Sequence, residues 1–322
     1  MYTAFSRYYR FKLSVEQKKI YDALLLGLEN RENEISTLPF STEDFNKILY
    51  AINFDNPHLY YVDFSRIRGV QNLLAGKFYV SYLIDEVTQR ALDKKIDLAV
   101  SKIIKQVVGQ PLNAAALLLH DWLVTHCTYG DCYDVPNASH SIVGAFLYSK
   151  CVCEGYAKAY KYLADKVKLR AIVVVGQGIH PDGSSGGHAW NIIMLDNVCY
   201  YVDVTFDLLF AGKYCSRAYY MLSTKEIVYD HSIDETFDMP DCPNNGNILR
   251  TVSGTVELIA FLDSESRSGV THSEVRLTKG FTSDKLMSMM KNRMTLKDAR
   301  WYSKIKSISY GDYSRSLFIC WK

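Results

Sequence analysis

A cysteine, a histidine and an aspartate in the middle third of the chain have the types and order of a catalytic triad. Cys153 lies in Cys-Glu-Gly-Tyr-Ala at the predicted start of a helix, His188 in Gly-His-Ala-Trp-Asn, and Asp203 in Tyr-Val-Asp-Val-Thr. A thiol that attacks an amide must be ionised, and both a helix N-terminus and a nearby imidazole favour the thiolate. We expect His188 to take the thiol proton and Asp203 to orient the imidazole.

A predicted hairpin brings the histidine and the aspartate together. Residues 189–195 and 198–204 are apolar, strand-like runs, and the Asp-Asn pair between them suits a two-residue turn. Counting back from that turn, Trp190 lies opposite Asp203, and His188 is the diagonal neighbour of Asp203 on the same face. A slip of one residue would separate the two side chains, so this interpretation depends on the turn.

Three further residues are considered for the site. Trp190 shares the face of His188 and could wall a substrate channel, or it could be a core aromatic. Tyr129 could donate a hydrogen bond to the oxyanion or to the thiol, or it could pack beneath the helix. Asp207 is a competitor for Asp203, but it lies further from the histidine in the predicted register. The backbone N–H of Cys153 could supply half of an oxyanion hole.

The elements around these motifs predict an α+β protein in three units. Residues 1–110 form a small α/β unit, residues 111–235 a core that carries the three motifs, and residues 249–322 a small α+β module. Capping boxes, apolar periodicity and turn residues support this division. In the first unit we predict helices that begin at Ser14 and Ser41, strands over 59–62 and 78–84, and a long helix over 85–108.

The predicted core packs the helix that bears Cys153 on an antiparallel sheet. A turn-rich linker over 231–248 precedes the third unit. The other elements predicted for the core are a helix over 112–126, a loop over 128–138, a short helix over 141–147, a strand over 171–175 and a flexible glycine-rich loop over 176–187. The third unit is predicted to contain strands over 252–262 and 307–321, with a helix near 283–291.

Taken together, the three motifs resemble the core of the transglutaminase-like superfamily, and they are most similar to its bacterial members. The resemblance covers about residues 112–235, including Thr-Tyr at 128–129 and Tyr-Tyr-Met-Leu-Ser at 219–223. It implies a papain-like core with Cys153, His188 and Asp203 as the triad. The N-terminal unit also resembles the segment that precedes this core in bacterial relatives, whereas the C-terminal module matches nothing we know.

Such a triad implies a thioester between the cysteine and an acyl group taken from an amide. Water as the acceptor would make the protein a cysteine protease or amidase, and a primary amine would make it a true transglutaminase that crosslinks glutamine. The triad alone does not choose between these acceptors. A non-catalytic binding or scaffold protein of the same fold is a third possibility, against which the intact triad argues. The expected partner is a protein or peptide substrate.

Composition and charge narrow the function classes further. The 322 residues are 48% hydrophobic and 22% charged, as in ordinary globular proteins. The net charge is +2, and no basic run is interleaved with aromatics, so we expect no nucleic-acid partner. No stretch of 18 apolar residues occurs and the first residues lack a signal-peptide pattern. We therefore expect a cytoplasmic protein with no membrane partner.

The eight cysteines all lie after residue 126, which is not the pattern of a disulfide framework. Reduced thiols are the simplest interpretation. Cys127, Cys132, Cys151 and Cys153 could suggest a zinc site, but they lack a regular Cys-x2-Cys spacing. We therefore expect no metal and no cofactor.

Overall fold

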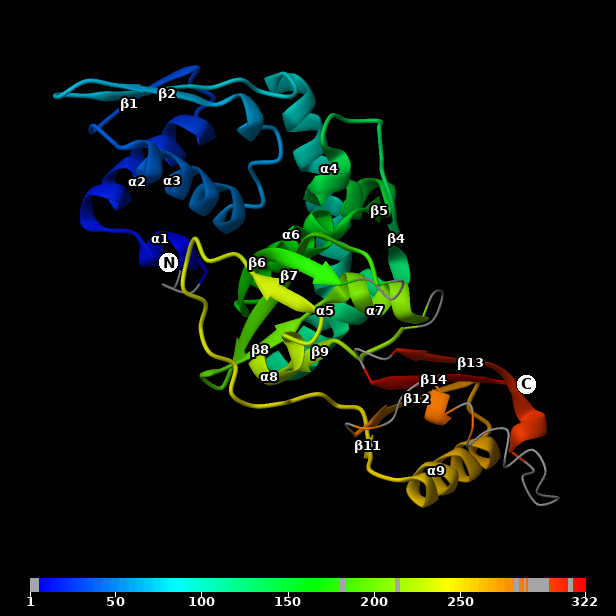
Figure 1. Ribbon diagram of the computed structural model, residues 1–322. Coiled ribbons are helices and arrows are strands. Elements are labelled where there is room, and N and C mark those ends of the chain that lie inside the picture. Colours follow the sequence, from blue (N-terminus) through cyan, green and yellow to red (C-terminus); the bar gives the residue numbers. More distant parts are fainter. Residues whose placement is uncertain are drawn as a thin grey trace.

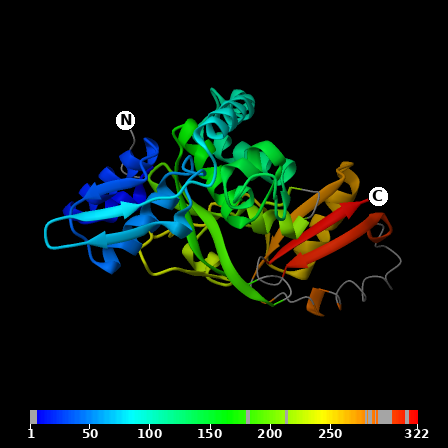
Figure 2. The same cartoon turned by 90° about the horizontal axis from the view of Figure 1, so that it is seen from above.

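The computed structural model describes residues 6–179, 183–211, 215–278, 280, 284–286, 288, 301–311 and 315–322. It is a mixed α and β protein whose larger sheets are mainly antiparallel, as predicted. Figure 1 shows an N-terminal group of helices with a small sheet, a central part built around helix α6, and a C-terminal sheet with one helix. The view from above places the N-terminal and C-terminal sheets at opposite ends of the molecule (Figure 2).

The N-terminal helices begin where their capping residues predict. The Ser14 side chain accepts a hydrogen bond from the Gln17 N–H, and Ser41 and Asp44 form the same capping box one helix later. The strand predicted over 59–62 is wrong as a continuous strand, because residues 60 and 61 form a turn and, of the four, only Val62 pairs, through a single bridge to Tyr82. All four residues are buried against the core. The elements are α1 (Tyr8–Lys12), α2 (Val15–Glu29), β1 (Glu34–Thr37), α3 (Thr42–Asp55), η1 (Phe64–Arg66), β2 (Arg68–Gln71), β3 (Gly76–Tyr79) and α4 (Glu86–Val107).

The central part packs α6 against a five-stranded antiparallel sheet with the order β10-β6-β7-β8-β9. Asn191 on β7 joins the two layers, since its amide donates to the Ala157 carbonyl of α6 and to Ile172 of β6. The helices are α5 (Leu112–His126), η2 (Ala138–His140), η3 (Gly144–Tyr148, a π-helix), α6 (Cys153–Lys166), α7 (Val204–Ala211) and α8 (Thr224–Ile227). The strands are β4 (Thr128–Tyr129), β5 (Lys150–Cys151), β6 (Arg170–Ile179), β7 (Ser185–Leu195), β8 (Val198–Val202), β9 (Tyr220–Leu222) and β10 (His231–Ile233).

The hairpin between β7 and β8 is confirmed. Leu195 pairs with Val198, and the turn residues Asp196 and Asn197 have φ of 49° and 63°, the left-handed conformation of a type I′ turn. The ladder ends at Val202, one residue before Asp203, and α7 begins at Val204. The strand predicted to run through residue 204 is therefore too long by two residues.

The flexible loop predicted over 176–187 is wrong for most of its length. Residues 176–179 continue β6 and residues 185–187 belong to β7. The glycines allow close contact there. A Cβ on Gly176 would lie 1.9 Å from the Ser232 carbonyl oxygen of β10, and a Cβ on Gly178 would lie 3.2 Å from the His188 ring. Glycine in these strands thus makes room for a neighbouring strand and for an imidazole.

One hydrophobic cluster runs from Tyr8 to Cys242 and includes both the N-terminal helices and the central sheet. Tyr9 illustrates the connection, since its buried hydroxyl donates to the Val173 carbonyl of β6. A second cluster, from Val252 to Trp321, forms the core of the C-terminal module. The boundaries predicted near residues 110, 235 and 249 stay a prediction.

The C-terminal module is a four-stranded sheet of order β11-β12-β14-β13 with α9 beside it. The strand predicted over 252–262 is wrong, because Leu258, Phe261 and Leu262 have helical spacing and bury one face of α9. Most of the helix predicted near 283–291 lies outside the described residues. The elements are β11 (Thr251–Val252), α9 (Thr255–Ser268), β12 (His272–Leu277), η4 (Tyr302–Lys304), β13 (Ile305–Gly311) and β14 (Ser316–Trp321).

Of the predicted linker over 231–248, residues 231–233 form β10 at the edge of the central sheet, so the linker begins later than expected. Among the described residues, no helix combines the length and apolar character needed to cross a membrane.

Candidate active site

Cys153 is the first residue of α6 and its side chain is partly exposed. The first intrahelical hydrogen bond runs from the Tyr156 N–H to the Val152 carbonyl, so the preceding N–H groups lie at the positive end of the helix dipole. Two sets of backbone contacts hold the chain just before the helix. The Val152 N–H donates to the Ser139 carbonyl at 3.0 Å, and β5 pairs in parallel with β4.

His188 lies on β7, and its buried ring reaches the carboxylate predicted for it. His188 Nε2 is 2.6 Å from Asp203 Oδ2, and both side chains are almost completely buried. The diagonal placement predicted from the hairpin brings the two residues together, although Asp203 lies just beyond the strand. Because Nε2 is bonded to Asp203, Nδ1 is the ring nitrogen that remains for a thiol.

Asp203 is fixed by the helix that follows it. Its Oδ1 accepts hydrogen bonds from the Thr205 and Phe206 N–H groups at 2.9 and 3.0 Å, which is an N-cap for α7. Its own N–H donates to the Tyr219 carbonyl at 3.0 Å. One carboxylate oxygen therefore holds the helix while the other holds His188, so the orientation of the imidazole is coupled to the start of α7.

The Cys153 thiol lies close enough to His188 to act on the protonation of the imidazole. Burial by itself lowers the pKa of His188, but the charge and hydrogen bond of Asp203, together with the contact to Cys153, raise that pKa to about 10. The pKa of the Asp203 carboxyl is shifted in the opposite direction. Burial works against its ionisation, yet its charge and hydrogen-bond contacts with His188 and His231 hold its pKa well below the usual range.

Tyr129 and Trp190 occupy different positions at this site. Tyr129 ends β4, is half-exposed, and its phenol lies near the Cys153 thiol. Burial is the main cause that raises the pKa of its phenol, and Cys153 adds to it. Trp190 is almost fully buried, and its ring stacks on His188 with centroids 5.6 Å apart. It therefore lies beneath the imidazole and not on an exposed wall.

The sequence interpretation missed His231 and Asp230. His231 Nε2 lies 3.0 Å from Asp203 Oδ2, the oxygen that also contacts His188, and His231 Nδ1 lies 2.6 Å from Asp230 Oδ1. The residue follows α8 in a segment interpreted as a linker, on a strand of three residues. A strand this short has too few positions for alternation to reveal it, so no pattern in the sequence signals the contact.

A third buried histidine, His120, contacts carboxylates away from Cys153. His120 Nε2 lies 2.9 Å from Asp207 Oδ2, and His120 Nδ1 lies 2.9 Å from Asp121 Oδ1. The Cys215 thiol donates to the same Asp121 oxygen at 3.2 Å, and Arg217 forms two hydrogen bonds to the Asp121 carboxylate. Asp207, the competitor considered for the triad, is therefore paired with His120 and not with His188.

Among the described residues, two groups have donor atoms close enough together to suggest a metal: His188, Asp203 and His231, and His120, Asp121 and Cys215. In both groups the imidazole nitrogens already face carboxylate oxygens at hydrogen-bond distance. In the second group Arg217 also balances the charge of Asp121. A cation would have to displace these contacts, so we assign no metal to either group.

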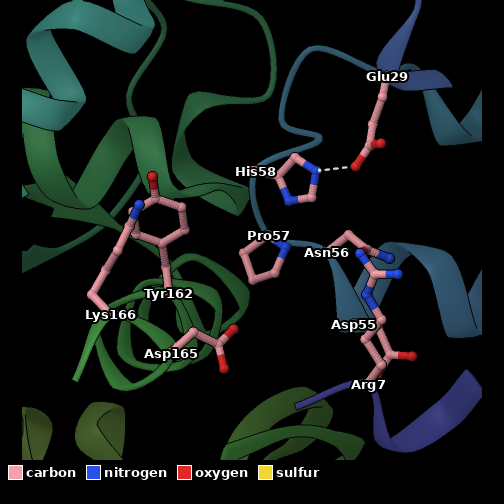
Figure 3. A pocket seen from close by; sticks show the side chains of 9 residues that line it. All are labelled: Arg7, Glu29, Asp55, Asn56, Pro57, His58, Tyr162, Asp165 and Lys166. Atoms are coloured by element: carbon pink, nitrogen blue, oxygen red, sulfur yellow. Dashed lines mark hydrogen bonds and ion pairs between the residues drawn. The ribbon is translucent and has the colours of Figure 1, made fainter. Parts of the chain in front are cut away.

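A polar cavity of about 230 Å³ lies between the N-terminal helices and the last turn of α6. Figure 3 shows Tyr162, Asp165 and Lys166 of α6 on one side, and His58 paired with Glu29 on the other. Cys153 begins α6, so the cavity lies roughly 15–20 Å further along the helix axis. This cavity is therefore separate from the thiol.

Comparison with protein-family models gives no match, and no curated protein matches the chain. Solved structures similar to it include a TGase (15% identity, 69% of this chain and 59% of that chain, TM-score 0.33). Others are a candidate cysteine protease from Cytophaga hutchinsonii (14%, 44% and 61%, 0.29) and the periplasmic domain of TgpA from Pseudomonas aeruginosa bound to ethylmercury (21%, 42% and 56%, 0.27). The chain thus spans about three fifths of the length of each. All three likenesses are at low identity and low TM-score, so the chemistry of this chain follows from its own residues.

Proposed function

We propose that the protein is a transglutaminase-like thiol enzyme that cleaves or transfers an acyl group at peptide or glutamine-type amides through a Cys153 thioester. The observation that carries this proposal is the arrangement in which the Cys153 thiol, at the start of α6, lies beside His188, and His188 is hydrogen-bonded to Asp203. A buried carboxylate, an imidazole with one nitrogen available to the thiol, and a partly exposed cysteine are the groups that nucleophilic catalysis needs.

Acylation begins with proton transfer from Cys153 Sγ to His188 Nδ1. The resulting thiolate is stabilised by the adjacent imidazolium and by the α6 dipole. It attacks the amide carbon, and the carbonyl oxygen becomes an oxyanion. The Cys153 N–H and the Tyr129 hydroxyl are the candidate donors to that oxygen, because both lie at the thiol. When the C–N bond breaks, His188 gives its proton to the leaving nitrogen, which leaves as an amine or ammonia.

Deacylation uses the same groups in reverse. His188, now neutral, takes a proton from water or from a primary amine, which attacks the thioester carbonyl. The C–S bond breaks and the thiolate–imidazolium pair is restored. Water gives a carboxylic acid, and an amine gives a new amide. Asp203 stays ionised throughout and keeps the proton of His188 on Nε2, so that Nδ1 always faces the reaction.

The test is to incubate the protein with a glutamine-containing peptide library and biotinylated pentylamine, and to follow cleavage, ammonia release and amine incorporation by mass spectrometry. Wild type is compared with Cys153→Ala and, as a matched control, with Cys215→Ala. We expect product from wild type and from Cys215→Ala, and none from Cys153→Ala.

The products also identify the acyl acceptor. Amine incorporation identifies a transglutaminase, whereas cleavage or ammonia release without incorporation identifies a hydrolase. The proposal is contradicted if no Cys153-dependent product forms and Cys153 also resists alkylation by iodoacetamide at neutral pH. That result would leave a non-catalytic protein with this fold.

A further inference from the structure

His231 lies at the edge of the central sheet, close to the proposed active site. It begins β10, which pairs with β6 so that His231 is opposite Gly178. Its side chain has no exposed surface, and its ring packs against Trp190, Phe206 and His188 with centroids 4.7, 4.6 and 5.3 Å away. A polar ring in so apolar a position has to be stabilised by specific partners.

Those partners are carboxylates on both ring nitrogens. Nε2 lies 3.0 Å from Asp203 Oδ2 and Nδ1 lies 2.6 Å from Asp230 Oδ1. The other Asp230 oxygen accepts the Tyr219 hydroxyl. A carboxylate can only accept a hydrogen bond, so an imidazole between two carboxylates satisfies both only when both of its nitrogens carry protons. With both aspartates ionised, this geometry requires His231 to be an imidazolium.

We propose that His231 is a positioning residue of the Cys153 site, a second cation that keeps Asp203 ionised and oriented toward His188. This inference rests on the proposed function. Asp203 Oδ2 is shared by two imidazoles, at 2.6 Å from His188 and 3.0 Å from His231. In the proposed reaction His188 alternates between its charged and neutral forms, whereas His231 has no contact with Cys153 among the described hydrogen bonds and keeps its proton.

The catalytic cycle shows why a second cation matters. When His188 gives its proton to the leaving group, Asp203 loses its strongest counter-charge in a fully buried setting. A buried carboxylate without a cation tends to take up a proton, and a protonated Asp203 could no longer hold His188 with Nδ1 unprotonated. The charge on His231 prevents this proton uptake.

The charge state of His231 is set by all the titratable groups that face it. These are Asp203 after β8, Asp230 beside it in the chain, His188 on β7 and Tyr219 before β9. Burial by itself lowers the pKa of His231, and the hydrogen bonds and charges of the two aspartates raise it above its ordinary value. The positive charge is therefore present below the raised pKa and is lost as the pH rises through it.

The experiment measures the alkylation of Cys153 at pH 7 by two reagents of similar size, anionic iodoacetate and neutral iodoacetamide, with the site mapped by mass spectrometry. The ratio of the two rates reports the positive charge around the sulfur, because thiolate reactivity affects both rates alike. Wild type is compared with two variants that remove the charge. His231→Gln keeps a polar side chain, and His231→Phe keeps an aromatic ring. The kcat and KM of any Cys153-dependent reaction are measured on the same proteins.

We expect the iodoacetate-to-iodoacetamide ratio to fall roughly threefold or more in both variants, because one cation near the site is lost. We expect kcat to fall roughly tenfold with KM within about twofold, because orientation of His188 matters in the transition state and not in binding. His120→Gln, which alters the buried histidine of the Asp207 network, serves as a control and should leave the ratio within about twofold of wild type.

A merely structural, neutral His231 would leave the rate ratio unchanged, and a ratio within about twofold of wild type in folded variants overturns the proposal. A lower ratio with unchanged kcat overturns it too, because the charge would then have no positioning role. If wild type turns over no substrate, the proposed function fails, while the alkylation ratio still decides whether His231 carries its charge. If neither variant folds, Asp230→Asn replaces them. This change removes one of the two carboxylates that keep His231 protonated, so it should also lower the iodoacetate-to-iodoacetamide ratio.

Discussion

Two clusters, each of a cysteine, a histidine and an aspartate, lie beside the first turn of α7. Cys153, His188 and Asp203 form the Cys153 cluster, and Cys215, His120 and Asp207 form the Cys215 cluster. The two aspartates are one helical turn apart, with the Asp207 N–H bonded to the Asp203 carbonyl at 3.2 Å. In both clusters Nε2 of a buried histidine meets the aspartate, so proximity alone does not distinguish them.

The second ring nitrogen distinguishes them. In the Cys153 cluster, Nδ1 of His188 is left for the thiol. In the Cys215 cluster, Nδ1 of His120 is 2.9 Å from Asp121, so both nitrogens face carboxylates. These two aspartates hold the pKa of His120 well above its ordinary value in spite of burial. An imidazole that keeps both protons cannot act as a base.

The surroundings of the two thiols also favour Cys153 over Cys215 as the nucleophile. Cys153 begins a helix of 14 residues, where the dipole favours an anion. Cys215 precedes β9 outside any helix, and its thiol donates to Asp121. Burial raises the pKa of Cys215 in spite of the contact with His120. The Cys215 cluster is therefore a structural network, and the comparison teaches that a triad is defined by its free nitrogen and by the position of its thiol.

The largest expected effect is the difference in activity between removing the Cys153 thiol and removing the Cys215 thiol. Cys153→Ala should lower kcat/KM by roughly 10⁴-fold or more, because the thioester cannot form. Cys215→Ala should leave kcat/KM within about threefold of wild type. Steady-state kinetics on a peptide that the wild type turns over measure both. A large loss of activity in Cys215→Ala would remove the distinction between the clusters.

Substituting Asp203 should mainly lower activity, whereas substituting Asp207 should mainly lower stability. Asp203→Asn should lower kcat by roughly 10² to 10⁴-fold, because an amide can hold His188 in the wrong tautomer. Asp207→Asn should leave kcat within about fivefold but lower the free energy of unfolding by about 3 kcal/mol, since a buried charged partner of His120 is lost. Urea titration and kinetics on the two variants test this. Equal kinetic losses would contradict it.

The pH dependence should also differ between the clusters. The folded pKa of His188, about 10, lies above the ordinary value of 6.5, so its charge is present at neutral pH and is lost as pH rises through about 10. We expect kcat/KM to fall about tenfold per pH unit above that value. Asp121 has a lowered pKa in spite of burial, owing mainly to His120 and Arg217. Its contribution to stability is present above pH 3.8 and is lost as pH falls through the lowered pKa.

A pH–rate profile tests the first expectation, and the urea midpoint measured from pH 7 down to pH 2 tests the second. Activity that persists unchanged at pH 11 would contradict the assignment of His188 as the acid. Arg217→Gln serves as the matched variant for the acid side, because it removes one partner of Asp121 and should weaken the stability contributed above pH 3.8.

The smallest expected effect concerns the contact between the Cys215 cluster and the C-terminal module. Glu274 of β12 is bonded to the Ser216 hydroxyl at 2.7 Å and to the Arg217 N–H at 2.9 Å. Burial and the charge of Asp207 raise the pKa of Glu274 to about 7. Its ionisation is therefore unfavourable in the folded protein, and stability is lost as pH rises from 4.5 through about 7.

Glu274→Gln imitates the protonated acid, so at pH 8 it should raise the free energy of unfolding by roughly 1 kcal/mol. At pH 5 it should have almost no effect, which makes the low-pH measurement its own control. Urea titration at both pH values measures the difference. A variant that is less stable than wild type at pH 8 would show that Glu274 is an ordinary ion-pair partner.

The sequence was enough to predict the elements with strong local signals. Capping boxes located α2 and α3, and apolar spacing located α5. The Asp-Asn turn fixed the register of β7 and β8, which places His188 and Asp203 together. These predictions succeeded because each depends on residues close together in the chain, where dihedral preferences and periodicity act directly.

The parts that failed depend on contacts between distant segments. Gly176 and Gly178 were interpreted as loop residues, yet they form strand positions that β10 and His188 approach closely. His231 reaches Asp203 only because β10 joins the sheet from 28 residues away. The same holds for the pairing of His120 with Asp207, which are 87 residues apart. Nothing in the local pattern of either histidine indicates its distant carboxylate partner.

The most direct measurement is limited alkylation of the native protein with iodoacetamide at pH 7, with all eight cysteines mapped by mass spectrometry. The difference between the clusters predicts that Cys153 is modified first, and at least about tenfold faster than Cys215. It also predicts that Asp203→Asn slows the reaction at Cys153 while Asp207→Asn does not. Faster modification of Cys215, or equal rates at the two thiols, would contradict the assignment of Cys153 as the nucleophile.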